Sequence, residues 1–308
     1  MIYLELSNRE KSLIDRGYSR GVVESLCYLD ENKLKEIEDR IYNDIIIGAS
    51  SVSKPYVTYI GGQPGSGKSV ISMRLKRISN AVEIGIDNYR MYHPNYLSIE
   101  KTIRAHWKDR EVTFNDSPGN DIADFTHNFS GMMTDRLIDR VSKEKYNILL
   151  EWSMRNPNQI INSVNEFKHK EYSINLNVLA VNKDVSLNAC HLRSDGMNEY
   201  GHIVRRVPDS FHEMCINDLP DSINKIYEEI SNKVNKFYVI DRDGSVIWDS
   251  RCENLPGNIL RDIINKDYTF ENIKNDVKWA VISYEKESLG LRFNYKKNNE
   301  FSGRKMVA

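Results

Sequence analysis

The residues with the clearest chemical potential form one short, glycine-rich segment. Residues 62 to 69 read GQPGSGKS, which matches the pattern G-x-x-x-x-G-K-S/T. The glycines let the backbone curl tightly enough for its N–H groups to converge on phosphate oxygens. A helix that starts near Lys68 adds its positive dipole end. The pattern therefore predicts a loop that binds the phosphates of a nucleoside triphosphate.

Two side chains of this loop have predicted roles in phosphoryl transfer. Lys68 is expected to reach the β- and γ-phosphates, and the Ser69 hydroxyl is expected to ligate Mg²⁺. We therefore expect ATP and Mg²⁺ as cofactors. The residues predicted to contact the nucleotide are Gly62, Gln63, Pro64, Gly65, Ser66, Gly67, Lys68, Ser69 and Val70.

Two acidic residues follow apolar runs and are candidates for work beside the phosphates. Asp87 follows the run from Val82 to Ile86, which we expect to be the strand beside the phosphate loop. There it is placed to accept a proton from an attacking hydroxyl. A helix N-cap or a water-mediated Mg²⁺ contact are the alternatives. Glu151 ends another apolar run and is expected to bind a substrate hydroxyl or a metal-bound water.

Arginines gather in a charged stretch of few apolar residues between Cys190 and Arg206. Such a stretch is typical of a lid that closes over a triphosphate. Arg193, Arg205 and Arg206 are the candidates to neutralise charge on the transferring phosphoryl group. The alternative is a solvated charged helix, because exposed charges contribute little on their own.

The surrounding pattern predicts the scaffold that positions these residues. Strand-like runs alternate with longer helical stretches, notably 122–145 and 222–235. This alternation predicts an α/β fold, a doubly wound parallel sheet with helices on both faces. An Asp-Gly pair before Val246 predicts a closing hairpin. The predicted strands are 56–60, 82–86, 147–150, 174–181 and 237–240.

The two ends of the chain differ from this central region. Residues 1–50 predict three short helices, with Ser7 and Glu10 at capping-box spacing. Residues 256–308 predict a helix to about Lys278, two strand-like runs at 279–284 and 289–295, and a polar tail. We therefore expect a helical N-terminal region (1–50), a phosphate-loop domain (55–255) and a C-terminal extension (256–308).

Bulk composition narrows the class of protein. A formal net charge of −1 over 308 residues gives no reason to expect nucleic acid or a membrane surface as the main partner. The four cysteines form no C-x-x-C pair, which argues against zinc and favours reduced thiols in the cytoplasm. No apolar run approaches the roughly 20 residues that span a bilayer.

Beyond the loop, three further segments resemble the zeta toxins, bacterial P-loop kinases. The family pattern Asp-x-Phe-Arg-x-x-His-Pro is matched from Asp87 to Pro94, with Tyr89 in place of Phe. The segment from Glu151 to Arg155 resembles Glu-Gly-Thr-x-Arg, with Trp152 and Ser153 as departures. An arginine pair about thirteen residues apart is the third match, with Arg193 first. Spacing favours Arg206 as second, whereas the downstream Leu219-Pro220 favours Arg205.

The resemblance covers about residues 55 to 252 and implies an activity. Zeta toxins phosphorylate the amino-sugar of UDP-N-acetylglucosamine, a cell-wall precursor, and a separate antitoxin holds them inactive. The resemblance also implies substrate contacts by Asp87, Arg90, Glu151, Ser153 and Arg155. The alternatives are a P-loop kinase with another acceptor (a nucleotide cofactor, an antibiotic or a polynucleotide end) and a nucleotide-binding switch without catalysis.

The N-terminal region raises one further hypothesis. Its third predicted helix carries an apolar face at helical spacing, made of Leu34, Ile37, Ile41 and Ile45. A short tether joins this helix to the strand before the phosphate loop. This face, or the charges beside it, is therefore a candidate cis-acting inhibitor of the nucleotide site. The alternative is that it packs on the main domain and stabilises it.

Overall fold

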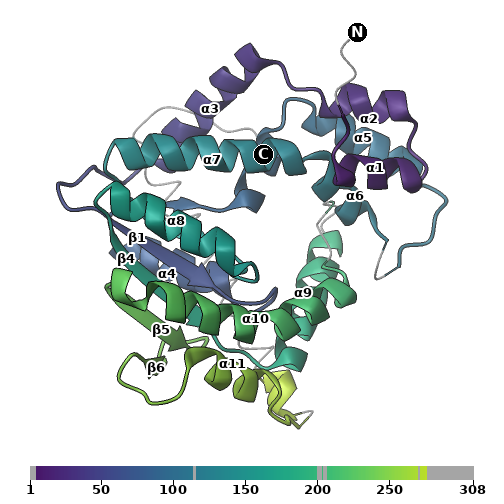
Figure 1. The fold of residues 1–308 in the computed structure, drawn as a ribbon. Helices are drawn as coiled ribbons and strands as arrows, with labels where there is room; N and C mark the ends of the chain where they lie inside the picture. The colour runs from purple at the N-terminus through teal and green to yellow at the C-terminus, as the bar shows by residue number, and fades with distance from the viewer. Residues whose placement is uncertain (1–4, 114–115, 200–202, 204–206, 270, 276–308) are drawn as a thin grey trace.

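A six-stranded sheet forms the centre of the molecule (Figure 1). The computed structural model describes residues 5–113, 116–199, 203, 207–269 and 271–275, with the side chains of 194–199 excepted. The strand order is β2-β3-β1-β4-β5-β6, and only the β5–β6 pairing is antiparallel. The strands are β1 (Tyr56–Gly61), β2 (Ala81–Ile84), β3 (Asn147–Glu151), β4 (Ser173–Leu179), β5 (Lys236–Ile240) and β6 (Val246–Asp249).

Helices cover both faces of the sheet, as expected for a doubly wound fold. Helices α7, α8, α10 and α11 pack on one face, and α4 packs on the other (Figure 1). In β1, Val57 and Tyr59 enter the larger core, whereas Ile60 enters the smaller core beneath α4. The helices on the sheet are α4 (Lys68–Ile78), α7 (His127–Lys143), α8 (Pro157–His169), α10 (Asp209–Ile230) and α11 (Pro256–Ile264).

Three predicted helix boundaries are wrong. The single helix expected over 122–145 is two helices, α6 (Pro118–Phe125) and α7, which meet at Thr126. The helix expected over 222–235 is α10, which starts at Asp209 and continues through the buried Pro220. Packing there outweighs the roughly 3 kcal/mol that an interior proline costs a helix. After Pro256 the predicted continuous helix is interrupted, because α11 ends at Ile264 and, among the described residues, the chain is helical again only at 271–275.

The position of the second strand also differs from the prediction. β2 is not beside β1, because β3 pairs with both and lies between them. Asp87 itself lies beyond β2, in the 3₁₀ helix η1 (Ile86–Tyr92). The strand that ends at Glu151 is therefore the neighbour of the phosphate-loop strand, and Asp87 is one strand further away.

The N-terminal helices pack in two different places. Helices α1 (Asn8–Asp15) and α2 (Arg20–Cys27) join α5 (Tyr96–His106) and α6 in a separate apolar cluster, seen at the upper right of Figure 1. The predicted capping box of Ser7 and Glu10 is confirmed at the start of α1.

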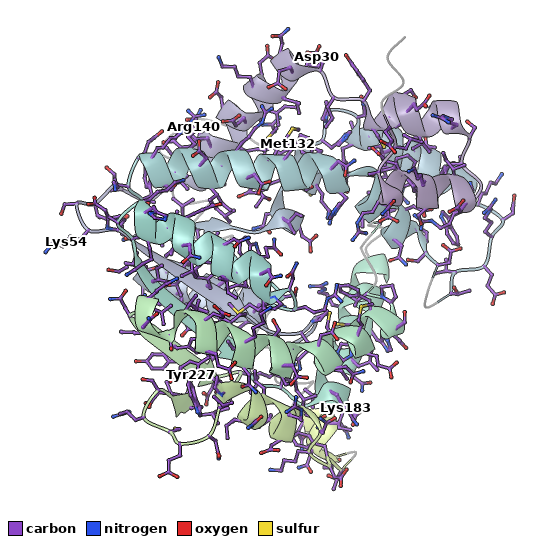
Figure 2. The ribbon with its side chains drawn as sticks, in the orientation of Figure 1. Asp30, Lys54, Met132, Arg140, Lys183 and Tyr227 are labelled. Carbon is purple, nitrogen blue, oxygen red and sulfur yellow. The ribbon has the colours of Figure 1, made fainter. Side chains whose placement is uncertain are left out.

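Helix α3 (Glu31–Ile45) lies instead along α7 and belongs to the main core. Its Leu34 and Ile41 are buried in that core, and Ile37 and Ile45 pack against it. Figure 2 shows Arg140 on the outer side of α7, where its guanidinium pairs with Asp39 of α3 at 2.6 Å. The apolar face therefore packs on the main domain and is not free to contact the nucleotide site, whereas an inhibitory role of the charges beside it stays a prediction.

Beyond β5 the predicted hairpin is confirmed. Gly244 adopts a φ of +95° in the turn between β5 and β6. The two strand-like runs expected at 279–284 and 289–295 lie outside the described residues. In the part of the chain that the structure describes, every helix is too short or too polar to cross a membrane.

The burial of α3 predicts that it stabilises the fold. Ile41→Ala should lower the free energy of unfolding by about 2–5 kcal/mol, because it opens a cavity in the main core. Ile47→Ala, at a position whose side chain is 52% exposed, is the matched control and should change stability by at most about 0.5 kcal/mol. Urea unfolding of both variants measures the difference, and equal effects would contradict the packing role of α3.

Candidate active site

The phosphate loop runs from the end of β1 to the start of α4 and is held by close backbone packing. Gly65 and Gly67 adopt φ values of +73° and +99°, a region that glycine enters without strain. A Cβ added at Gly65 would lie 2.0 Å from the carbonyl oxygen of Ser186. Ser186 belongs to α9 (Lys183–Glu199), so glycine at position 65 lets the loop rest directly on that helix.

Lys68 is folded onto the loop that it belongs to. Its Nζ donates to the carbonyl oxygens of Gly62 and Gln63, both at 2.9 Å. Burial lowers the pKa of Lys68, the negative charge of Glu151 raises it, and the positive charge of Arg193 lowers it. Lys68, Glu151 and Arg193, three residues far apart in the sequence, are thus close enough for their charges to interact.

Ser69 and Glu151 connect the start of α4 with the end of β3. The Ser69 hydroxyl donates to a carboxylate oxygen of Glu151 at 3.2 Å. Burial raises the pKa of Glu151 to about 7, and repulsion from Glu83 adds to the rise. Lys68 and the Ser69 hydrogen bond oppose the shift, and Asp87 contributes a smaller rise. The Glu151 carboxyl group is therefore largely shielded from water and lies close enough to Asp87 for the two charges to interact.

Asp87 and Arg90 form a pair within η1. The guanidinium of Arg90 donates through Nε to Asp87 Oδ1 at 2.8 Å, and its NH2 lies 2.7 Å from the same oxygen. Arg90 is buried, whereas the Asp87 side chain is 54% exposed. The NH1 nitrogen of Arg90 donates to Ala123 O at 2.8 Å and to Thr126 Oγ1 at 2.9 Å. Arg90 thus links Asp87 to the junction of α6 and α7.

The remaining predicted residues lie around this centre at different distances from it. Ser153 is exposed, just after β3. Arg155 pairs with Asp218 of α10 at 3.0 Å, and its guanidinium lies 5.8 Å from the ring centroid of Phe211. Arg193 is exposed on α9, where its charge acts on Lys68. Two further predicted residues, Arg205 and Arg206, lie outside the described residues.

Sequence reasoning missed the support behind the loop. Gln63 Nε2 donates to Val181 O at 2.7 Å and contacts Ser186 Oγ at 3.4 Å. Ser186 Oγ in turn lies 2.8 Å from Nε2 of His212 on α10. Burial lowers the pKa of His212 to about 4, so its imidazole is neutral at physiological pH. Gln63 lies in the phosphate-loop pattern, but no spacing rule marks Ser186 and His212, because they meet it only in three dimensions.

Arg242 is a second residue that the sequence did not mark. It lies in the turn after β5, and its NH2 donates to the carbonyl oxygen of Gly65 at 2.8 Å. The hairpin at the sheet edge therefore contacts the phosphate loop. An Asp-Gly turn predicted this hairpin, but not that it touches the loop.

The chain is similar in sequence to known zeta toxins. The zeta toxin family model matches residues 39–253, which is more than half of the chain. The toxin PezT of Streptococcus pneumoniae is 25% identical over 240 residues, which cover 76% of this chain and 87% of that protein. The zeta toxin of Streptococcus pyogenes is 24% identical over 222 residues, covering 70% and 71%.

The solved structures agree in fold. A chain from the PezAT toxin–antitoxin system of Streptococcus pneumoniae superposes with a TM-score of 0.67 at 21% identity. The match covers 84% of this chain and 98% of that one. A chain from the complex of AvrRxo1-ORF1 and AvrRxo1-ORF2 with ATP gives a TM-score of 0.52 at 12% identity, covering 93% and 92%. From the family match and the shared fold, the chain belongs to the zeta toxin family of kinase-type toxins.

Proposed function

We propose that this protein transfers the γ-phosphoryl group of ATP to a hydroxyl of a nucleotide sugar, UDP-N-acetylglucosamine, and so blocks cell-wall synthesis. The observation that carries the proposal is the contact between the phosphate loop and the end of β3. Lys68 Nζ is held by the carbonyl oxygens of Gly62 and Gln63, and the Ser69 hydroxyl donates to Glu151 at 3.2 Å. In this proposal the kinase unit spans residues 55–255, and residues 1–50 and 256–308 are additions to it.

ATP binding is supported by the loop and by a structural relative. The backbone from Gly62 to Val70 leads into the N-terminus of α4, where N–H groups and the helix dipole favour phosphate. Lys68 is held at this loop and supplies the positive charge for the β- and γ-phosphates. A solved structure of the same fold was crystallised with ATP.

Mg²⁺ fits the oxygen donors at the start of α4. Ser69 and Glu151 place a hydroxyl and a carboxylate within 3.2 Å of each other, and Mg²⁺ prefers such oxygen ligands. Within the described residues no cluster of three or more His, Cys, Asp or Glu side chains is arranged to hold a metal. Ser69 is therefore the proposed direct ligand, and Glu151 orients a metal-bound water. When bound, the ion neutralises charge on the transferring group.

Asp87 is the proposed general base. Its carboxylate is half exposed, so a substrate hydroxyl can reach it, and Arg90 fixes its orientation from behind. The guanidinium of Arg90 donates to Asp87 Oδ1 at 2.8 Å, and in this proposal the substrate hydroxyl donates to Oδ2. Arg90 therefore acts on the substrate through Asp87 rather than by direct contact.

The proposed acceptor site is formed by the end of β3 and the residues just after it. Glu151, Ser153 and Arg155 are the proposed contacts to the nucleotide sugar. Trp152 packs against Tyr59, with ring centroids 5.7 Å apart, so its ring is part of the core beneath that site. Arg193, Arg205 and Arg206 are the proposed lid residues that stabilise the transferring phosphoryl group.

An antitoxin is the proposed protein partner. The similar PezT chain comes from a toxin–antitoxin system, as the description of its structure states. Because α3 packs in the main core and does not present its apolar face to the nucleotide, a separate chain is the better candidate for an inhibitor.

Lys68→Ala should lower phosphoryl transfer by at least about 10²-fold, because it removes the charge aimed at the β- and γ-phosphates. Lys76→Ala is the matched control on the same helix. Its ammonium pairs with Glu83 at 3.6 Å and is expected to have no catalytic role. Turnover of radiolabelled ATP by both purified variants measures the effect. Wild-type turnover by Lys68→Ala would refute the kinase proposal.

Asp87→Asn should lower kcat by roughly 10²–10⁴-fold and leave ATP affinity unchanged, as expected for loss of a general base. The side chain keeps its size, so the contact with Arg90 changes in charge more than in shape. Single-turnover kinetics and ATP titration separate the two effects. If ATP binding is lost while the protein remains folded, Asp87 has a metal or structural role instead.

The identity of the acceptor is tested with radiolabelled ATP and a panel of nucleotide sugars, nucleotides and oligonucleotides. We expect label on UDP-N-acetylglucosamine, and we expect expression in a bacterium to slow growth or cause lysis. If the label appears on a different class of molecule and expression is harmless, that molecule is the acceptor and the proposal of UDP-N-acetylglucosamine is wrong. ATP binding with no transfer to any of them would favour a nucleotide-binding switch.

A further inference from the structure

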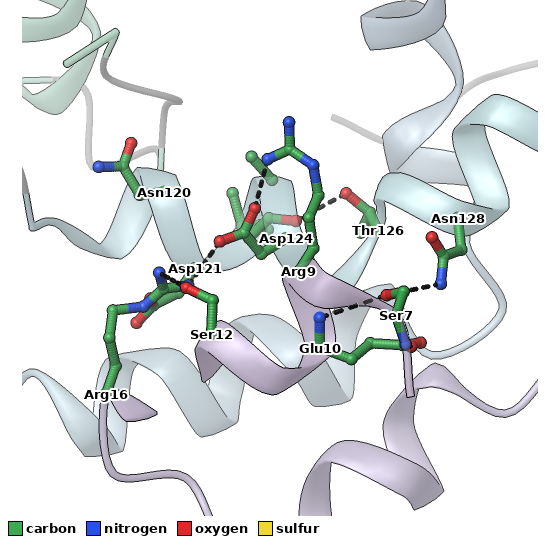
Figure 3. Close-up of polar contacts among 12 residues, drawn as sticks. Ser7, Arg9, Glu10, Ser12, Arg16, Asn120, Asp121, Asp124, Thr126 and Asn128 are labelled. Atoms are coloured by element: carbon green, nitrogen blue, oxygen red, sulfur yellow. Dashed lines mark hydrogen bonds and ion pairs between the residues drawn. The ribbon is translucent and has the colours of Figure 1, made fainter. Parts of the chain in front are cut away.

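The first link of an extended contact chain joins the N-terminal helices to α6. Figure 3 shows Arg9 and Arg16 of the α1 segment reaching Asp124 of α6. Arg9 NH1 lies 2.6 Å from one carboxylate oxygen of Asp124, and Arg16 NH2 lies 2.7 Å from the other. The Asp124 side chain is only 10% exposed. Both of its oxygens are therefore held by α1.

A second carboxylate on α6, that of Asp121, has three partners. Asp121 is fully buried, and its Oδ1 lies 2.6 Å from Nε of Arg16 in an ion pair. Its Oδ2 accepts hydrogen bonds from Tyr18 Oη and Trp107 Nε1, both at 2.6 Å. Removing one partner of a buried ion pair is costly, because the remaining charge is left without compensation. The position of α6 therefore depends on Arg16.

The last link joins α6 to Asp87. At the end of α6, the carbonyl of Ala123 and the hydroxyl of Thr126 both accept from NH1 of Arg90. Thr126 is fully buried, and its own hydroxyl donates to Ile122 O at 2.6 Å, which fixes its orientation. The opposite side of the Arg90 guanidinium holds Asp87. Each contact in the chain orients the next one.

We propose that Arg16, Asp121, Asp124 and Thr126 are positioning residues for the reaction, which act through Arg90 on the carboxylate of Asp87. This inference rests on the proposed role of Asp87 as the base. A half-exposed carboxylate samples several rotamers unless a neighbour fixes it, and general-base catalysis needs it within hydrogen-bond reach of the hydroxyl. The N-terminal helices are thus part of the active-site scaffold.

The N-terminal part of this arrangement lies outside the range of the family model. The matched range starts at residue 39, so α1, α2 and Arg16 lie before it. A second tie supports the same coupling, because Asn95 Nδ2, just after η1, donates to Leu26 O at the end of α2 at 3.0 Å. The N-terminal helices therefore hold the segment of Asp87 from both sides, through α6 and through Asn95.

Two pairs of variants test the two ends of the chain of contacts. Arg16→Gln removes the anchor of α6, and Arg20→Gln is its control, because Arg20 pairs with Glu24 within α2 at 2.7 Å. Thr126→Val removes the hydroxyl that accepts from Arg90, and Thr126→Ser retains it. We expect Arg16→Gln and Thr126→Val to lower kcat by about tenfold, within the range reported for small misplacements of catalytic groups. KM for ATP should be unchanged, and both controls should retain wild-type kcat.

A double-mutant cycle separates positioning from loss of stability. In the Asp87→Asn background, Arg16→Gln and Thr126→Val should have no further effect on kcat, because the group that they orient is already disabled. The same tenfold loss in both backgrounds would overturn the inference. Unchanged kcat in the Asp87→Asn variant alone would instead refute the proposed base. If Arg16→Gln does not fold, the Thr126→Val and Thr126→Ser pair decides the outcome.

Discussion

The active site depends on a close contact between two backbones. Gly65 of the phosphate loop lies so near the Ser186 carbonyl that any side chain at this position would push α9 away. Because interiors are close-packed, such a shift would spread to the elements behind. Ser186 touches Gln63 of the loop and His212 of α10, and α9 also carries Arg193. Because Gly65 has no Cβ, the phosphate loop can pack directly against α9, which in turn contacts α10.

Local signals were sufficient to predict the elements that carry the loop. The glycine pattern, the apolar runs and the Asp-Gly turn each act within a few residues, so the loop, the six strands and the closing hairpin were predictable. The capping box of Ser7 and Glu10 is equally local and was also predicted. The break at Thr126 was not, because neither glycine nor proline marks it and the Thr126 hydroxyl bonds back to Ile122 O.

Contacts between distant segments could not be predicted from one sequence. Strand order is one example: nothing local indicates that β3 pairs between β1 and β2, so Asp87 was expected one strand too close to the loop. The partners of Arg90 are another, since Ala123 and Thr126 follow it by more than thirty residues. Arg16 and Asp121 are further apart still. Ion pairs of this kind have no periodicity, and only the fold reveals them.

The intervening strand β3 sets the distance between the ends of β1 and β2. Neighbouring strands are spaced about 4.8 Å apart, so the ends of β1 and β2 are separated by roughly 10 Å. The backbone hydrogen-bond ladder fixes this spacing, and side-chain substitutions in the sheet barely change it. Glu151 ends the strand in the middle of that gap. The separation between the ends of β1 and β2, after which the phosphate loop and the segment of Asp87 begin, is therefore a property of the backbone. Loops above the sheet can therefore change in sequence during evolution while the spacing of the strand ends beneath them stays the same.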